Sequence, residues 1–132
     1  MVKTCQYGKY HSVIIMEKSK KPGKQRKALY QAKPHKRQKL MRANLSEDLR
    51  EEYGKRSAGL RTGDKVKVTR GDFKDHEGTV EKVSLKDMRV HVSGATSKKA
   101  SGMDRMYPIH PSSVMITKFE LKDEKRRQIL ER

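Results

Sequence analysis

The sequence predicts a mainly β protein, with one small antiparallel barrel or sandwich between a basic, partly helical arm and a short C-terminal helix. Short apolar runs separated by Gly, Pro and Asp turns fill the stretch from residue 57 to residue 120, a pattern typical of several short strands. Only 33% of the residues are hydrophobic and 5% are aromatic. Such a composition provides one small core, so the remaining residues are expected to form an arm and a tail.

The positive charge is concentrated in the first third of the chain. The formal net charge is +17; residues 1–44 contain 13 basic residues and one acidic residue, whereas residues 45–132 contain 20 and 15. An excess of this size attracts an anionic partner, and nucleic acid is the first candidate. The longest strongly apolar run, residues 13–16, is too short to span a membrane. The single cysteine, Cys5, cannot form an internal disulfide, which fits a reducing, cytosolic compartment.

The basic segment has too few apolar residues for a core of its own. Pro22 and Gly23 are expected to prevent a helix at its start, whereas Pro34 is expected to open a short helix through about Met41, since proline is tolerated in a first helical turn. Residues 1–44 are expected to hold no strand and no core residue. Two interpretations stay open at this point: a solvated basic tail, or an arm that orders on RNA or DNA, with its cations on phosphates and a tyrosine free to stack.

Helices are expected at both ends of the β domain. Ser46 can cap a short helix that ends at Gly54 and leads into the domain. Residues 121–132 contain good helix formers but only a thin apolar face, so they predict a marginal helix. Asp123 and Arg127 stand at the spacing of a helical ion pair.

The β pattern begins at Arg61. Val66 and Val68 alternate with lysines, as in a strand that is half exposed to water. Val80 and Val83 have opposite parity, which predicts a bulged or strongly coiled strand. The later elements are expected as a strand at residues 88–92, a weak polar strand or loop at residues 95–101, a strand near Tyr107, a turn at His110 and Pro111, and a final strand from Val114.

The loop between the first two of these strands gathers charged side chains that could suggest a metal or catalytic site: Asp72, Asp75, His76 and Glu77. Their spacing is neither that of a calcium loop nor that of a zinc site, and little apolar sequence is present to build a pocket that shifts pKa values. We therefore predict no enzyme, no catalytic residue, no metal and no cofactor. Gly71 and Gly78 are expected where φ is positive or another segment passes close.

Three segments together resemble a known family. Residues 61–83 resemble a KOW motif, with Gly63 and Asp64, alternating valines, Gly71, and Glu77 and Gly78 before the next strand. Residues 24–56 look like the N-terminal arm of the archaeal and eukaryotic-type large-subunit ribosomal protein family L twenty-four, called L twenty-six in eukaryotes. Residues 107–118 look like that family's closing strands, so the resemblance covers about residues 20–120.

The resemblance implies an SH3-like barrel with a basic extension, in a structural constituent of the cytoplasmic large ribosomal subunit. It also implies binding to large-subunit rRNA near its 5′ end, an early place in assembly and a position near the exit of the nascent-peptide tunnel. Implied partners are rRNA, neighbouring ribosomal proteins and factors that dock at the tunnel exit, with no membrane and no small-molecule substrate. The alternatives are a regulatory KOW module of a transcription elongation factor, which would need a companion domain, and a metal-dependent enzyme.

Carried over by position, the resemblance assigns rRNA contacts to the arm and to the KOW loop. The arm residues are Lys24, Gln25, Arg26, Lys27, Tyr30, His35, Lys36, Arg37 and Lys39, and those at the loop are Lys65, Lys67, Arg70, Gly71, Lys74 and His76. The expected division of the chain is a basic arm at 16–56, a barrel at 57–120 and a helical tail at 121–132. Residues 1–15 match nothing in the family; they are either an extension or the product of a start assigned upstream of Met16, where translation is expected to begin.

Overall fold

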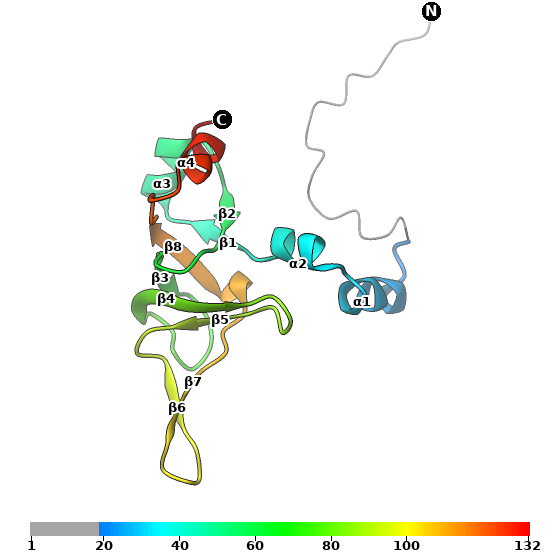
Figure 1. Cartoon of the computed structure of the whole chain (residues 1–132), viewed down its shortest axis with the longest axis vertical. Helices are drawn as coiled ribbons and strands as arrows, with labels where there is room; N and C mark the ends of the chain where they lie inside the picture. The colour runs from blue at the N-terminus through cyan, green and yellow to red at the C-terminus, as the bar shows by residue number, and fades with distance from the viewer. Residues whose placement is uncertain (1–18) are drawn as a thin grey trace, which may run out of the picture.

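A computed structural model describes residues 19–132 as a six-stranded mixed sheet with a separate two-stranded hairpin and four α-helices (Figure 1). The expected start at Met16 lies outside these residues. The strand order in the large sheet is β2-β1-β8-β3-β4-β5. The strands are β1 (Arg42–Leu45), β2 (Ser57–Gly59), β3 (Lys65–Val68), β4 (Glu77–Ser84), β5 (Arg89–Val92), β6 (Thr96–Lys98), β7 (Asp104–Met106) and β8 (Val114–Lys118). The prediction of a mainly β protein is confirmed.

The alternating valines place one face of the sheet in the core. Val66 and Val68 on β3 are each 1% exposed, and Val90 on β5 is fully buried. On β4, the register against β5 shifts between Val80 and Lys82, which is the bulge that the spacing of the valines predicts. A short 3-10 helix, Pro111–Ser113, follows the predicted proline turn and leads directly into β8.

Strand β1 corrects two expectations. It pairs antiparallel with β2 but parallel with β8, so the sheet is not purely antiparallel. Ala43 and Leu45 on β1 and the preceding Met41 are buried, so residues 1–44 do contain a strand and core residues. A four-residue strand between two helices has little periodicity of its own, and its pairing partner lies about seventy residues further along the chain.

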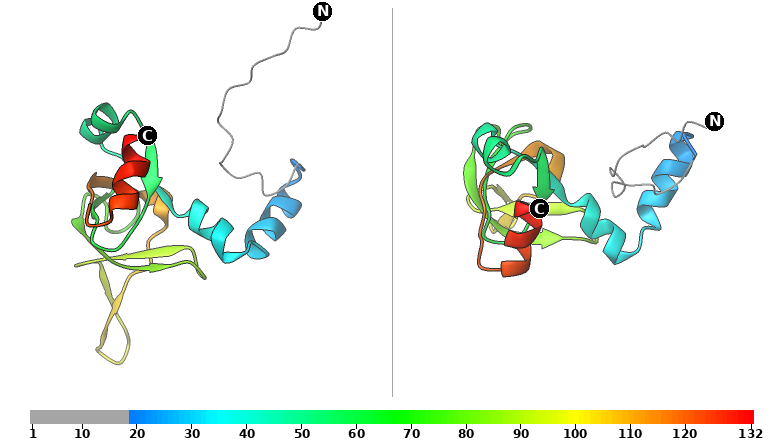
Figure 2. Two further views of the ribbon diagram at one scale, coloured as in Figure 1. Left: turned by 45° about the horizontal axis from the view of Figure 1, so that its top comes forward. Right: turned by 90° about the horizontal axis from the view of Figure 1, so that it is seen from above.

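The basic segment forms two helices, α1 (Pro22–Tyr30) and α2 (Pro34–Leu40). The expectation that Pro22 and Gly23 prevent an early helix is wrong, because Pro22 occupies the first helical position, where its missing N–H costs nothing. Pro34 opens α2 in the same way, as predicted. Figure 2 shows both helices extending away from the β domain.

Helix α3 (Glu47–Tyr53) has the predicted ends. The Ser46 side chain accepts a hydrogen bond from the Leu49 N–H, and Gly54 stops the helix in the left-handed conformation, at φ 61°. Helix α4 (Glu124–Glu131) also forms as expected. The structure does not give Asp123 the expected pairing with Arg127; instead it caps α4 and forms an ion pair with Arg61.

Helix α4 is fastened to the sheet by a buried ion pair. The two terminal guanidinium nitrogens of Arg126 donate to the carboxylate of Asp64, at 2.6 and 2.7 Å, and both side chains are almost completely buried. Asp64 also accepts the backbone N–H groups of Arg61 and Glu120. The Arg126 guanidinium lies 5.0 Å from the centre of the Phe119 ring. Both buried charges therefore have hydrogen-bonding partners. A marginal helix on the surface would not need such a buried ion pair to hold it to the sheet.

Candidate nucleic-acid interface

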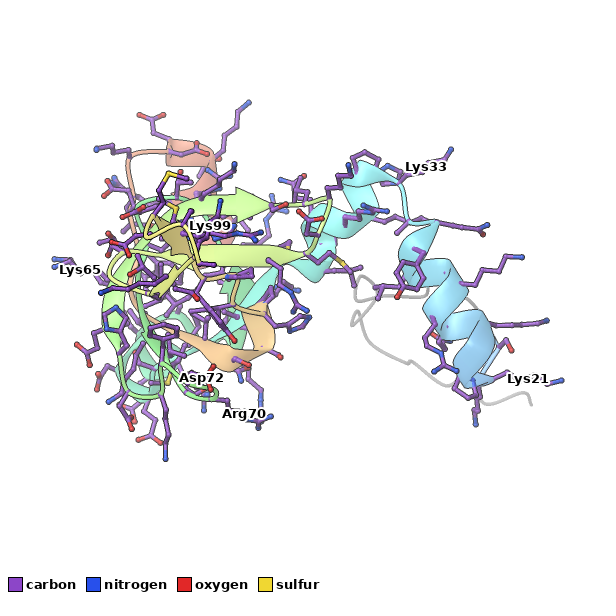
Figure 3. The ribbon with its side chains drawn as sticks, turned by 90° about the horizontal axis from the view of Figure 1, so that it is seen from below. Lys21, Lys33, Lys65, Arg70, Asp72 and Lys99 are labelled. Carbon is purple, nitrogen blue, oxygen red and sulfur yellow. The ribbon has the colours of Figure 1, made fainter. Side chains whose placement is uncertain are left out.

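Helices α1 and α2 form an exposed cationic arm. Residues 19–40 contain nine Lys and Arg residues and no Asp or Glu. Neither helix buries any of its residues, and Figure 3 shows side chains, including those of Lys21 and Lys33, directed into solvent around them. The like charges on such a surface repel one another in the free protein, and an anionic partner stabilises the surface by neutralising them.

One arm residue from the predicted set has a structural role. The Nε atom of Arg37 donates to the Ala32 carbonyl at 2.9 Å, one terminal nitrogen donates to the Tyr30 carbonyl at 2.7 Å, and the other donates to the Lys86 carbonyl at 2.9 Å. The first two bonds hold the turn between α1 and α2, and the third ties the arm to the β4–β5 turn. Arg37 therefore orients the other cations of the arm.

The other predicted arm residues are open to solvent. The Tyr30 side chain is 77% exposed, so its ring is free to stack on a base. The Gln25 side-chain amide donates to the Ser19 carbonyl at 2.5 Å, before the start of α1. The remaining predicted contacts are exposed around both helices: Lys24, Arg26, Lys27, His35, Lys36 and Lys39.

The predicted loop residues fall into two groups. Arg70, Gly71 and Lys74 are exposed on the loop between β3 and β4, where Gly71 has a φ of 101° that favours glycine. His76 instead faces the protein: its Nε2 atom lies 2.8 Å from the Ser93 carbonyl oxygen. Lys67 lies between two acidic side chains, Asp75 and Glu77, and Lys65 is exposed on β3.

The loop is supported by aromatic contacts. The Phe73 ring lies 5.0 Å from the Tyr107 ring, centre to centre, and 6.4 Å from the His76 ring. The Tyr107 hydroxyl donates to the carboxylate of Asp72 at 3.4 Å. These contacts fix the loop against the chain that enters the 3-10 helix, so Arg70 and Lys74 are carried on a supported loop.

The predicted residues do not converge on one patch. In Figure 3 the arm leaves the domain on one side, Lys65 lies on the opposite side, and Arg70 lies at a third position. A partner that touches the arm and the loop together must therefore be large. Small molecules do not fit this geometry, whereas a folded RNA does.

Sequence reasoning missed three further cations. Lys98, Lys99 and Arg105 are exposed on or beside the hairpin strands β6 and β7. The segment "ATSKKAS", residues 95–101, is predicted as a weak polar strand or loop, and its paired lysines are the signal that points to this exposed cationic surface.

His110 is structural. Burial, followed by the nearby Arg89 charge, lowers the pKa of His110 below its usual value. The lowered pKa favours the neutral ring, whose Nδ1 atom accepts the Ser112 N–H at the start of the 3-10 helix.

Two other features are absent from residues 19–132. No three side chains of His, Cys, Asp or Glu in this part of the chain gather as a metal site requires. None of its helices is both long and apolar enough to cross a membrane.

Comparison with known proteins identifies the family. The model of the family that comprises the eukaryotic ribosomal proteins L26 and their archaeal L twenty-four counterparts matches residues 19–132. The chain belongs to this family. The resemblance seen in the sequence is therefore confirmed, and the match starts at the first residue that the structure describes.

Archaeal relatives in this ribosomal protein family are close in sequence and in length. Over 108 residues the chain is 57% identical to the large ribosomal subunit protein uL24 of Methanosarcina barkeri, which covers 82% of this chain and 93% of that protein. Over 114 residues it is 52% identical to uL24 of Methanosphaera stadtmanae, which covers 86% of this chain and 97% of that protein. Family members are structural rather than catalytic, which agrees with the function expected from the sequence.

Proposed function

We propose that the chain is a structural protein of the cytoplasmic large ribosomal subunit that binds rRNA through its cationic arm and its β3–β4 loop. Family membership makes it a ribosomal protein. The single observation that supports RNA as the direct partner is the arm: residues 19–40 contain nine cations and no acid, and neither α1 nor α2 buries a residue. An arm of this kind is stabilised when its cations bind the phosphates of a nucleic acid.

The arm and the loop have different tasks in this proposal. The exposed arm cations neutralise phosphates, Tyr30 stacks on an unpaired base, and Arg37 holds the arm to the β4–β5 turn. Arg70 and Lys74 contact RNA from a loop of fixed shape, which selects one RNA fold among many. We further propose that the curved sheet is an SH3-like KOW barrel, and that the arm ends and the domain begins near residue 40.

The resemblance supports a more detailed location. We place the rRNA contact near the 5′ end of the large-subunit rRNA, in an early assembly step, with the protein near the exit of the nascent-peptide tunnel. The elongation-factor alternative is not favoured, because the relatives that match nearly their whole length are ribosomal proteins.

Binding over a salt series tests the proposal. The arm variant replaces Lys24, Arg26, Lys36 and Lys39 with Gln, and the matched control replaces Lys118, Lys122, Lys125 and Arg132, which are exposed on β8 or near α4. Each lost phosphate contact flattens the plot of log affinity against log salt by about 0.7 to 0.9 units. We therefore expect the arm variant to lose about three units of slope and the control to lose almost none.

The ligand in this experiment is a 5′ fragment of the large-subunit rRNA, with an unrelated RNA of equal length as the competitor. The arm variant should bind more than about tenfold more weakly at physiological salt, since several contacts are lost together. Equal affinity and slope for the arm variant and the unaltered protein would contradict the proposal.

A further inference from the structure

The β6–β7 hairpin projects from the domain in a direction different from that of the arm (Figure 1). All six strand residues, Thr96–Lys98 and Asp104–Met106, are exposed, and the two strands pair only with each other. An isolated two-stranded hairpin is marginally stable in water. Its projecting shape is therefore best explained by a partner that lies beyond the domain.

The charge of the hairpin indicates the class of partner. Lys98, Lys99 and Arg105 form neither an ion pair nor a side-chain hydrogen bond with any residue from 19 to 132, and Asp104 is the one acid between residues 96 and 106. Three unpaired cations against one acid favour an anionic surface. Ala100, Ser101 and Gly102 make the turn narrow, so the tip can enter a confined space.

Apolar side chains accompany these cations. Met103 is 62% exposed and Met106 is 42% exposed. Methionine is among the side chains that pack on or between nucleic-acid bases, next to cations that bind the phosphates. The combination of cations and exposed methionines on a thin hairpin therefore fits a folded RNA.

The base of the hairpin is fixed to the β3–β4 loop. The Tyr107 N–H donates to the carbonyl of the buried Ala95 at 2.8 Å, which closes the hairpin, and the Tyr107 ring contacts Phe73 of the loop. In the turn between β5 and β6, the Ser93 carbonyl lies 2.8 Å from the Nε2 atom of His76. Figure 1 shows the loop on the side of the domain from which the hairpin projects. Loop and hairpin thus form one supported surface.

We propose that the β6–β7 hairpin, through Lys98, Lys99 and Arg105, is a second RNA contact that binds an rRNA segment different from the one bound by the arm. The inference rests on the proposed function, because it names a second RNA contact in the same protein. With the arm on one segment and the hairpin on another, the protein ties together two parts of the rRNA that are distant in sequence.

The first test is a charge variant of the hairpin in the full chain. Lys98, Lys99 and Arg105 are replaced by Gln, and Lys118, Lys122 and Lys125 are replaced in a control that removes the same charge. We expect the hairpin variant to bind the complete large-subunit rRNA about tenfold more weakly at physiological salt, with a salt slope about two units shallower. An affinity and slope equal to those of the control would overturn the inference.

The second test locates the contacts. An iron chelate that generates hydroxyl radicals is attached either to Ser101→Cys at the hairpin tip or to Ser19→Cys before α1, each in a Cys5→Ser background. We expect the two probes to cleave two different rRNA segments. The positions of cleavage distinguish a bridging protein from one that holds a single segment.

The outcomes of the second test distinguish the hairpin inference from the proposed function. If the arm probe cleaves rRNA and the hairpin probe does not, the hairpin inference is overturned and the proposed function stands; the hairpin would then face a protein or solvent. If both probes cleave the same segment, the inference of a second segment is overturned. If neither cleaves and the arm variant binds normally, the proposed function itself fails.

Discussion

Gly78 has a crowded position on β4. A Cβ atom there would lie 2.7 Å from the Ser93 carbonyl oxygen and 2.7 Å from a Val92 methyl carbon. Gly78 is not among the glycines with positive φ. Of the two reasons that the sequence offers for this glycine, the close approach of another strand is therefore the correct one. Gly71, 7 positions earlier, illustrates the other reason, with its φ of 101° and open space around it.

We expect Gly78→Ala to destabilise the domain by roughly 1–3 kcal/mol, because the Ser93 carbonyl, directly after β5, must shift to admit the methyl group. The matched control is Gly59→Ala, since the nearest atom to a Cβ there is 4.0 Å away. The control should change the free energy of unfolding by less than about 0.5 kcal/mol. Urea unfolding of both variants measures the difference, and equal midpoints would contradict the steric argument.

The buried ion pair between Asp64 and Arg126 should also make a measurable contribution to the free energy of unfolding. Asp64→Ala leaves a guanidinium that is almost completely buried without its carboxylate, so we expect a loss of about 3–5 kcal/mol in the free energy of unfolding. Lys125→Ala, at an exposed neighbouring position, should have little effect. Chemical denaturation measures both variants.

A double-mutant cycle isolates the interaction itself. The variant with both Asp64→Ala and Arg126→Ala should be destabilised by less than the sum of the two single variants, since neither charge is then left buried alone. Strictly additive costs would show that the pair is not coupled.

At the scale of elements, β1 decides where the arm ends. A chain that starts at residue 41 keeps Met41 and the whole of β1, whereas a chain that starts at residue 45 loses Met41 and Ala43 and leaves β2 without its partner strand. Truncating one buried Met typically costs about 2–5 kcal/mol, and a small domain has only about 5–15 kcal/mol in total.

We therefore expect the chain that starts at residue 41 to unfold cooperatively at nearly the temperature of the full chain, and the chain that starts at residue 45 to show no cooperative transition. Circular dichroism during heating measures both. A stable domain in the shorter chain would show that β1 is dispensable.

The sequence predicted elements with local signals and missed those that depend on distant partners. The ends of α3 were predictable because Ser46 and Gly54 act within one helical turn. The bulge on β4 was predictable from the spacing of its valines. By contrast, β1 is held by β8 and Asp64 is held by Arg126, 62 positions away, and no short pattern announces either contact.

The same distinction explains the error at Asp123. Helical spacing predicted a pairing with Arg127, but the Asp123 carboxylate pairs instead with Arg61, which is 62 positions away in the sequence. For the candidate interface, composition found the arm, but it could not show that Arg37 holds the arm rather than remaining open to solvent.

At the scale of the whole molecule, the arm and the β domain differ in what stabilises them. Helices α1 and α2 have 9 and 7 residues and bury none of them, and isolated helices of this length are marginal in water. The amides of residues 22–40 should therefore exchange rapidly with deuterium in the free protein and slowly on rRNA. Hydrogen exchange followed by mass spectrometry tests this, with β8 as the slow reference. Slow exchange of the arm without RNA would contradict it.

The position of β8 has a consequence for how the protein is made. This strand lies between β1 and β3, although it is the last strand in the chain. During synthesis the arm emerges first, but the sheet stays divided until Val114–Lys118 has followed, and Asp64 stays unpaired until Arg126 arrives. We therefore expect the β domain to fold only after β8 and Arg126 have been synthesised. The arm does not depend on these later segments. RNA can therefore bind the arm of a nascent chain before the β domain has folded.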